Sequence, residues 1–249
     1  MSYHKISCYN FRRFSLFYLY NYLLKTGDIM ELYIVTRKNA LINNYYSLLV
    51  EKVIEKEKIV KIRDVSSKYN SLLGKLLLQF CFEKYYKNNN LKLNRNKYNK
   101  PYIMNSSKFF NLSHSKDKVI LVVDNNPVGI DIEFIGSIDF SIVKKFFSFE
   151  EQLYLNSLKT KKNLGFFKLW TQKESFVKCF GKGFFHDIFD TNMVIDNKLV
   201  NYKSYKEDKY HFYNSVVENH FIISICSPIK NKSLYINYID IDVLINWFT

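Results

Sequence analysis

Hydrophobic and polar positions along the chain predict alternating strands and helices from residue 30 onward. Apolar runs rich in Val, Ile and Phe predict strands at 31–36, 109–115, 118–124, 128–133 and within 190–226. Helical spacing of apolar residues predicts helices at 41–57, 66–86 and within 141–180. Because only the turn NNP, 125–127, separates two of the strands, we expect strands 118–124 and 128–133 to form a hairpin.

This order of elements favours an α+β fold of two similar halves with antiparallel sheets. The predicted domains are residues 30–118 and 119–249, preceded by an extension at 1–29. The polar, turn-rich segment 87–108 is expected to be a surface connection. The last apolar segment, 234–248, predicts either an edge strand or an element packed over the second half.

The composition narrows the class of protein. With 47% apolar residues among 249, the chain can bury an ordinary core, so a disordered protein is excluded. The net charge of +14 favours anionic partners without choosing among nucleic acid, an acidic protein surface and a phosphorylated metabolite. The four cysteines lack zinc-ligand spacing and indicate a reducing compartment. No apolar run approaches the roughly 20 residues of a membrane span, so no membrane partner is expected.

The first 29 residues differ from the rest of the chain. They include FRRFSLFYLYNYLLK, in which two arginines precede an apolar and aromatic run, and they contain no acidic residue before Asp28. Met30 then opens MELYIVTRK, which is typical of the first strand of a domain. The segment is therefore interpreted either as a start codon assigned too early or as a leader. We expect a cytoplasmic protein, or an organellar one if the segment is a leader.

The strand VGIDIE carries two acidic residues on one face. Side chains alternate along a strand, so Asp131 and Glu133 project together, about 7 Å apart, while Ile130 and Ile132 face the other side. Two such carboxylates can hold one hard cation. The alternative is a half-buried strand whose solvent-facing side is acidic.

The segment FFKLWTQKESFVKCF predicts a helix with charged residues beside its apolar face. Lys173 falls within the apolar arc and Glu174 at its edge, with Lys178 one turn further on; the arc consists of Phe166, Leu169, Trp170, Phe176, Val177 and Phe180. A buried carboxylate needs a metal, a lysine or strong donors. The alternative is a surface Glu/Lys pair at the edge of a core stripe.

Two further residues are candidates with structural alternatives. His114 lies between two hydroxyls in NLSHS and precedes the basic KDK, which suits a phosphate contact, although a lone histidine is often structural. Ser148 is a candidate N-cap, and Glu151 is at the capping-box position, which explains a glutamate there without chemistry.

Together these segments resemble the 4′-phosphopantetheinyl transferases of the surfactin-synthetase-activating type. The matching stretches are FNLSHS, VGIDIE, KKFFSFEE, LWTQKESFVKCFGKG and, less closely, YNKPYI and SLLGKLLL. They occur in the family's order and at plausible spacing over 109–183, with a looser similarity over 30–249. Residues 1–29 lie outside the resemblance.

The resemblance implies a fold and a reaction. Two α+β halves related by pseudo-two-fold symmetry would hold coenzyme A in the cleft between them. The phosphopantetheine group would pass from coenzyme A to a serine of an acyl or peptidyl carrier protein, releasing adenosine 3′,5′-bisphosphate. Asp131, Glu133 and Glu174 would hold Mg²⁺. Glu151 would accept the serine proton, and Lys178 would neutralise charge on the leaving phosphate.

The resemblance also implies contacts to coenzyme A. The expected coenzyme-binding residues are His114, on the 3′-phosphate, together with Lys58, Ser71, Lys100, Pro101 and Lys173. Two positions depart from the family pattern. Asn99 replaces the usual glycine before Lys-Pro, and Asn70 replaces a frequent arginine, so binding of the adenosine end is expected to differ.

We expect a monomer whose lysines steer acidic carrier proteins. Two other hypotheses remain open. A basic nucleic-acid-binding protein would use the 18% aromatic content for stacking, but many aromatics here have core spacing and the hypothesis leaves the acidic residues unexplained. An inactive transferase-like protein would bind coenzyme A or a carrier without catalysis. The sequence alone does not identify the carrier.

Overall fold

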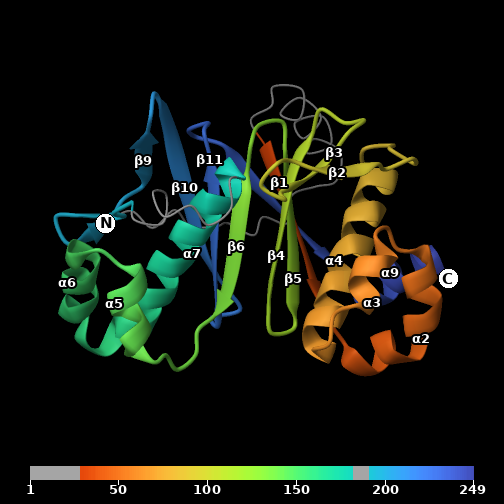
Figure 1. Cartoon of the computed structure of the whole chain (residues 1–249), viewed down its shortest axis with the longest axis horizontal. Helices are drawn as coiled ribbons and strands as arrows, with labels where there is room; N and C mark the ends of the chain where they lie inside the picture. The colour runs from red at the N-terminus through yellow and green to blue at the C-terminus, as the bar shows by residue number, and fades with distance from the viewer. Residues whose placement is uncertain (1–28, 182–190) are drawn as a thin grey trace, which may run out of the picture.

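The computed structural model describes residues 29–181 and 191–249. The predicted extension lies outside these residues except for Ile29. Two four-stranded sheets form the centre of the molecule, and helices cover their outer faces (Figure 1).

The first sheet has the order β12-β1-β5-β4, from β1 (Ile29–Thr36), β4 (Phe109–Ser115), β5 (Lys118–Asp124) and β12 (Ser233–Ile239). Strand β12 pairs parallel with β1, and the other pairs are antiparallel. The second sheet has the order β6-β11-β10-β9, all antiparallel, from β6 (Gly129–Phe134), β9 (Tyr202–Tyr205), β10 (Asp208–Val217) and β11 (Phe221–Ser227). The two sheets lie side by side in the middle of the view.

Each sheet has its own helices. Beside the first lie α2 (Asn39–Lys52), α3 (Lys56–Val60), α4 (Val65–Lys84) and α9 (Ile241–Phe248). Beside the second lie the short η1 (Phe140–Ile142), α5 (Val143–Phe146), α6 (Phe149–Ser157), η2 (Lys159–Lys161) and the long α7 (Lys162–Phe180). Two small hairpins complete the described parts: β2 (Leu93–Arg95) with β3 (Pro101–Ile103), and β7 (Val194–Ile195) with β8 (Lys198–Leu199). Within the described ranges, every helix is too short or too polar to cross a lipid bilayer.

The α+β class is confirmed, but three local predictions need correction. The helix predicted at 41–57 divides into α2 and α3, with Glu55 between them in the left-handed region at φ 56°. Strands β5 and β6 do not form a hairpin; β5 pairs with β4 across a tight turn in which Lys116 adopts φ 54°, and β6 crosses to the second sheet. The segment 87–108 is not only a connection, because it contains the β2–β3 hairpin.

The end of the chain follows the first of its two predicted alternatives. Strand β12 lies at the edge of the first sheet, and α9 buries Ile241, Leu244 and Ile245 in the core beneath α2 and α4. Both β5 and β12 therefore belong to the sheet of β1, so sheet membership does not follow the predicted division at residue 118.

The core has three layers because the central strands are apolar on both faces. One cluster fills the space between the first sheet and its helices, and a second lies between α5, α6, α7 and the second sheet. The third lies between the sheets, where alternate residues of β1, β5, β6 and β11 meet; it includes Leu32, Val122, Ile130, Ile132 and Ile223. The acidic residues of β6 therefore face away from this middle layer.

A ladder of side chains joins the edge strands of the two sheets. Asn111 Oδ1 in β4 accepts a hydrogen bond from the backbone N–H of Ile130 at 2.9 Å. Ser113 Oγ accepts from the backbone N–H of Ile132 at 3.4 Å, and Ser115 Oγ accepts from that of Phe134 at 3.0 Å. These side chains of β4 therefore accept hydrogen bonds from backbone N–H groups on the edge of β6 that pairs with no other described strand. The sheets are thus held in a fixed register where the acidic residues lie.

Replacing Asn111 with alanine is expected to lower the free energy of unfolding by about 1–3 kcal/mol. The change leaves the buried N–H of Ile130 without its acceptor, and an unsatisfied buried donor costs about this much. Urea unfolding measures the effect. The control is Asn125→Ala, which alters an exposed residue of the loop after β5 and is expected to leave stability unchanged. Equal stability of the two variants would contradict the structural role of the ladder.

Candidate functional site

Asp131 and Glu133 of β6 face α7, where Glu174 and Lys178 project toward them. Asp131 is buried, and its Oδ1 accepts hydrogen bonds from Lys178 Nζ at 2.6 Å and Ser113 Oγ at 2.9 Å. Glu133 Oε2 accepts from Ser115 Oγ at 2.9 Å. The serines of the ladder therefore bind the β6 backbone and hold the carboxylates of the same strand.

Gly129 allows α7 to approach β6 closely enough for this arrangement. A Cβ atom at Gly129 would lie 2.1 Å from the carbonyl oxygen of Ser175 and 2.3 Å from the backbone nitrogen of Cys179. Any larger residue would push the helix away from the strand. The glycine in VGIDIE is thus a packing requirement of the site.

The three carboxylates repel one another in a partly dehydrated space. Burial, and then the charge of Asp131, raise the pKa of Glu133 above its usual range. The pKa of Glu174 is raised to about 7, chiefly by burial; Lys178 opposes the rise, and Asp131 and Glu133 add to it. Raised pKa values of neighbouring buried carboxyl groups are typical of functional sites.

The donor set fits a hard divalent cation. It consists only of carboxylate oxygens, which Mg²⁺ prefers. Asp131 Oδ2 is buried and has no hydrogen-bond donor among the described residues, so one oxygen is available to a ligand. In the part of the chain that the structure describes, no three His, Cys, Asp or Glu side chains already form a metal-binding group. The ammonium of Lys178 is the cation in contact with Asp131.

A cavity of about 210 Å³ opens beside these groups. It is lined by Glu174 and Lys178 of α7, by Asn111 of β4, and by Lys100 and Pro101 at the start of β3. The structure thus brings the predicted Lys-Pro pair to the same cavity as two residues of the α7 motif. Residues predicted to contact coenzyme A and a residue predicted to hold the metal therefore line one cavity.

His114 and a residue that sequence reasoning missed form a basic face next to the carboxylates. The His114 side chain is exposed at the end of β4, and burial of part of the ring, with Lys178 and Arg37 nearby, lowers its pKa. Arg37, just after β1, donates from Nη1 to the Ser66 backbone and to Asn70 Oδ1 at 3.0 Å. Asn70 thus binds a guanidinium from another element. An arginine directly after a buried strand was the available signal.

Glu151 and Lys173 form a closed ion pair inside the second half. Both side chains have no exposed area, and Lys173 Nζ lies 2.8 Å from Glu151 Oε2. The same carboxylate completes the capping box with Ser148 and accepts from the backbone N–H of Met193 at 2.8 Å. The predicted capping is confirmed. Neither the expected proton transfer to Glu151 nor the expected coenzyme contact of Lys173 finds support in this environment.

The remaining predicted contacts lie further into the first half. Lys58, on α3, is half exposed and pairs with Glu55, while Ser71 is half-buried in α4. Among the contacts of the described residues, none ties either one to the carboxylates of β6. Lys100 reaches across to the second half, where its ammonium donates to the carbonyls of Val128 and Cys179, each at 3.1 Å.

Comparisons with known proteins place the chain in a family. The model of the 4′-phosphopantetheinyl transferase superfamily matches residues 127–226, which include both carboxylate motifs. The 4′-phosphopantetheinyl transferase gsp of Aneurinibacillus migulanus is 31% identical over 230 residues, covering 88% of this chain and 95% of that protein. The chain belongs to the 4′-phosphopantetheinyl transferase superfamily.

Two further transferases of the superfamily match shorter parts of the chain. The 4′-phosphopantetheinyl transferase Sfp of Bacillus subtilis (strain 168) is 34% identical over 133 residues, covering 52% of this chain and 59% of that protein. The 4′-phosphopantetheinyl transferase psf-1 of Bacillus pumilus is 51% identical over 75 residues, covering 30% and 32%. The resemblance on the quoted motifs is therefore confirmed at the level of the superfamily.

In EDTA, the stability of this transferase is expected to fall as pH rises from about 4.5 to about 7. Glu174 releases its proton near 4.5 when unfolded but near 7 when folded, so the folded state binds more protons in this window. Glu174→Gln should match the wild type at pH 4 and exceed its unfolding free energy by up to about 3 kcal/mol at pH 8. Urea unfolding at both pH values measures this, with the exposed Glu207→Gln as control. Parallel pH profiles of stability for all three proteins would contradict the raised pKa of Glu174.

Glu151→Gln is expected to destabilise the fold by about 3–5 kcal/mol, because it leaves the ammonium of Lys173 buried without its carboxylate. The double variant Glu151→Gln, Lys173→Met should regain most of this loss, since it removes both charges. Thermal and urea unfolding compare the three proteins. If Glu151 served only as a proton acceptor, Glu151→Gln would be as stable as the wild type and lose turnover alone.

Proposed function

We propose that this chain transfers the 4′-phosphopantetheine group of coenzyme A to a serine of an acyl or peptidyl carrier protein, releasing adenosine 3′,5′-bisphosphate. The observation that carries the proposal is the grouping of Asp131, Glu133, Glu174 and Lys178 from β6 and α7 beside a cavity that Glu174 and Lys178 line, in a chain of this superfamily. The relatives named above support the same transfer, since each bears the name of a 4′-phosphopantetheinyl transferase.

We assign Asp131, Glu133 and Glu174 as the residues that hold Mg²⁺. Bound there, the cation would neutralise charge on the pyrophosphate of coenzyme A and would polarise the phosphoryl group that is attacked. The chain's own part is to keep the carboxylates of Asp131 and Glu133 together at the junction of the sheets, against their repulsion, by means of Ser113 and Ser115.

Lys178 neutralises negative charge that builds on the leaving phosphate. Its side chain is 29% exposed and its ammonium reaches Asp131 from α7, so it is accessible to a phosphate oxygen beside that carboxylate. His114 and Arg37 stand on the same side and suit the 3′-phosphate of coenzyme A. Lys100 and Pro101 line the cavity that would receive the coenzyme next to Glu174.

We assign Glu151 a structural role, that of holding α6 and α7 together, rather than proton transfer. Its ion pair with Lys173 ties α6 to α7, and the capping box fixes the start of α6. Lys58 and Ser71 remain proposed coenzyme contacts from the first half.

The finer architecture and the partner form part of the proposal. The two sheet-and-helix units are taken as halves related by pseudo-two-fold symmetry, with the coenzyme in the cleft where they meet. We propose a cytoplasmic monomer without nucleic-acid partners. The net charge of +14 favours docking of acidic carrier proteins.

The test is the intact mass of a purified apo carrier protein after incubation with this chain, coenzyme A and Mg²⁺. A phosphopantetheine-sized gain that disappears with EDTA is expected. Asp131→Ala should abolish the gain while its unfolding free energy and coenzyme A binding are still measurable, because it removes a central carboxylate. The exposed Asp208→Asn serves as control and should transfer normally. Near-normal turnover by Asp131→Ala would refute the metal assignment, and no gain on any carrier despite coenzyme A binding would favour an inactive binder.

A further inference from the structure

The β2–β3 hairpin links the helices of the first half to the end of α7. On one side, Arg95 reaches Glu55 between α2 and α3. On the other side, Asn96 Nδ2 donates to the carbonyl of Gly181 at 2.8 Å, and Lys100 donates to the carbonyl of Cys179. The hairpin therefore spans the two units at the cavity beside Glu174.

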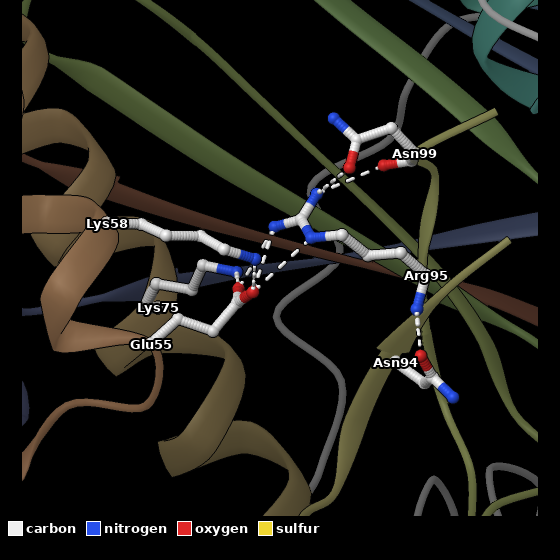
Figure 2. Close-up of polar contacts among 6 residues, drawn as sticks. All are labelled: Glu55, Lys58, Lys75, Asn94, Arg95 and Asn99. Atoms are coloured by element: carbon white, nitrogen blue, oxygen red, sulfur yellow. Dashed lines mark hydrogen bonds and ion pairs between the residues drawn. The ribbon is translucent and has the colours of Figure 1, made fainter. Parts of the chain in front are cut away.

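Glu55 anchors the first side through three cations (Figure 2). Lys75 Nζ lies 2.5 Å from Glu55 Oε2, Arg95 Nη2 lies 3.1 Å from each carboxylate oxygen, and Lys58 pairs with Oε1. The Glu55 side chain is only 16% exposed, and these partners hold its pKa at about 2 despite burial. Because α3, α4 and β2 each contribute one cation, the carboxylate fixes three elements at one point.

Arg95 divides its guanidinium between this anchor and the turn of the hairpin. Nε and Nη2 bind Glu55, while Nη1 donates to the backbone carbonyl of Asn99 at 3.0 Å and to its side-chain oxygen at 3.3 Å (Figure 2). Asn99 has φ 69°, a left-handed conformation that glycine adopts freely and that costs most other residues about 1–2 kcal/mol. Arg95 thus stabilises an asparagine where relatives were expected to have glycine.

The turn of the hairpin also fixes the position of Lys100. Asn96 Oδ1 accepts from the backbone N–H of Lys100 at 2.9 Å, and the Lys100 side chain packs directly on Gly181. A Cβ atom at Gly181, which has φ 62°, would lie 2.3 Å from Lys100 Cδ. The Lys100 ammonium donates to the carbonyl of Cys179 in the last turn of α7, where a cation is favourable, and to that of Val128 just before β6. Its position therefore depends on the hairpin being held from both sides.

We propose that Glu55, Arg95 and Asn99 form a brace that positions Lys100 for coenzyme A binding and holds α7 against the first half. These three are positioning residues, since they act through the hairpin and not on the reacting atoms. The proposal rests on the proposed function for its kinetic readout. Its structural readout, the protection of the hairpin, does not depend on that function.

Arg95→Met tests the brace against Arg95→Lys and Lys75→Met. Arg95→Met is expected to raise KM for coenzyme A about tenfold with kcat changed less than twofold, because charge-assisted hydrogen bonds are lost far from the reacting atoms. Amide hydrogen exchange in 93–103 should accelerate about tenfold without any ligand. Arg95→Lys should regain stability through Glu55 but keep the high KM, since one ammonium cannot bind Glu55 and Asn99 together. Lys75→Met removes a Glu55 partner outside the hairpin and should keep the wild-type KM.

The outcomes separate the brace from the proposed function. Faster exchange in the hairpin of Arg95→Met with normal exchange in Lys75→Met supports the brace even if the wild type transfers nothing to any carrier. A wild-type KM and unchanged hairpin exchange in Arg95→Met would overturn the proposal. Full rescue of KM by Arg95→Lys would also overturn it, because an ion pair to Glu55 alone would then suffice.

Discussion

The side-chain ladder from β4 to β6 is the constraint on which the rest of the structure depends. Two sheets that meet edge to edge would each present unpaired backbone groups at the junction. Asn111, Ser113 and Ser115 supply oxygen acceptors at every second residue, which matches the spacing of the inward-facing N–H groups of β6. Because the serine hydroxyls also donate to Asp131 and Glu133, the contacts that join the sheets also orient the carboxylates.

The charged groups of α7 illustrate two different uses of a buried ion pair. Lys173 and Glu151 are fully enclosed, and Glu151 accepts a further hydrogen bond from the backbone N–H of Met193, so the pair keeps α6 and α7 in register. Lys178 and Asp131 are paired at the edge of a cavity, beside two more carboxylates, and Asp131 Oδ2 finds no donor in the described part of the chain. The first pair is closed to ligands, whereas the second can exchange partners. The two lysines are five residues apart, so they point to different environments although they share one helix.

Much of the site was predictable because its signals are local. The apolar arc of α7 placed Lys173 inside the core and Glu174 at its edge, and strand alternation put Asp131 and Glu133 on one face. Two of the three failed predictions depended on long-range pairing. The short turn after β5 suggested a hairpin, yet β6 pairs with β11 from nearly 90 residues later. The β2–β3 hairpin was hidden by its polar sequence, since its strands are short and its partners, such as Glu55, are distant.

The measurement that tests the account most directly is a crystal structure of the chain with coenzyme A and Mn²⁺, read by anomalous scattering. One strong anomalous peak is expected in contact with Asp131, Glu133, Glu174 and the pyrophosphate, with the Lys178 ammonium on a phosphate oxygen instead of Asp131. A peak elsewhere, or coenzyme A bound while Lys178 stays on Asp131 and the carboxylates hold no metal, would contradict it.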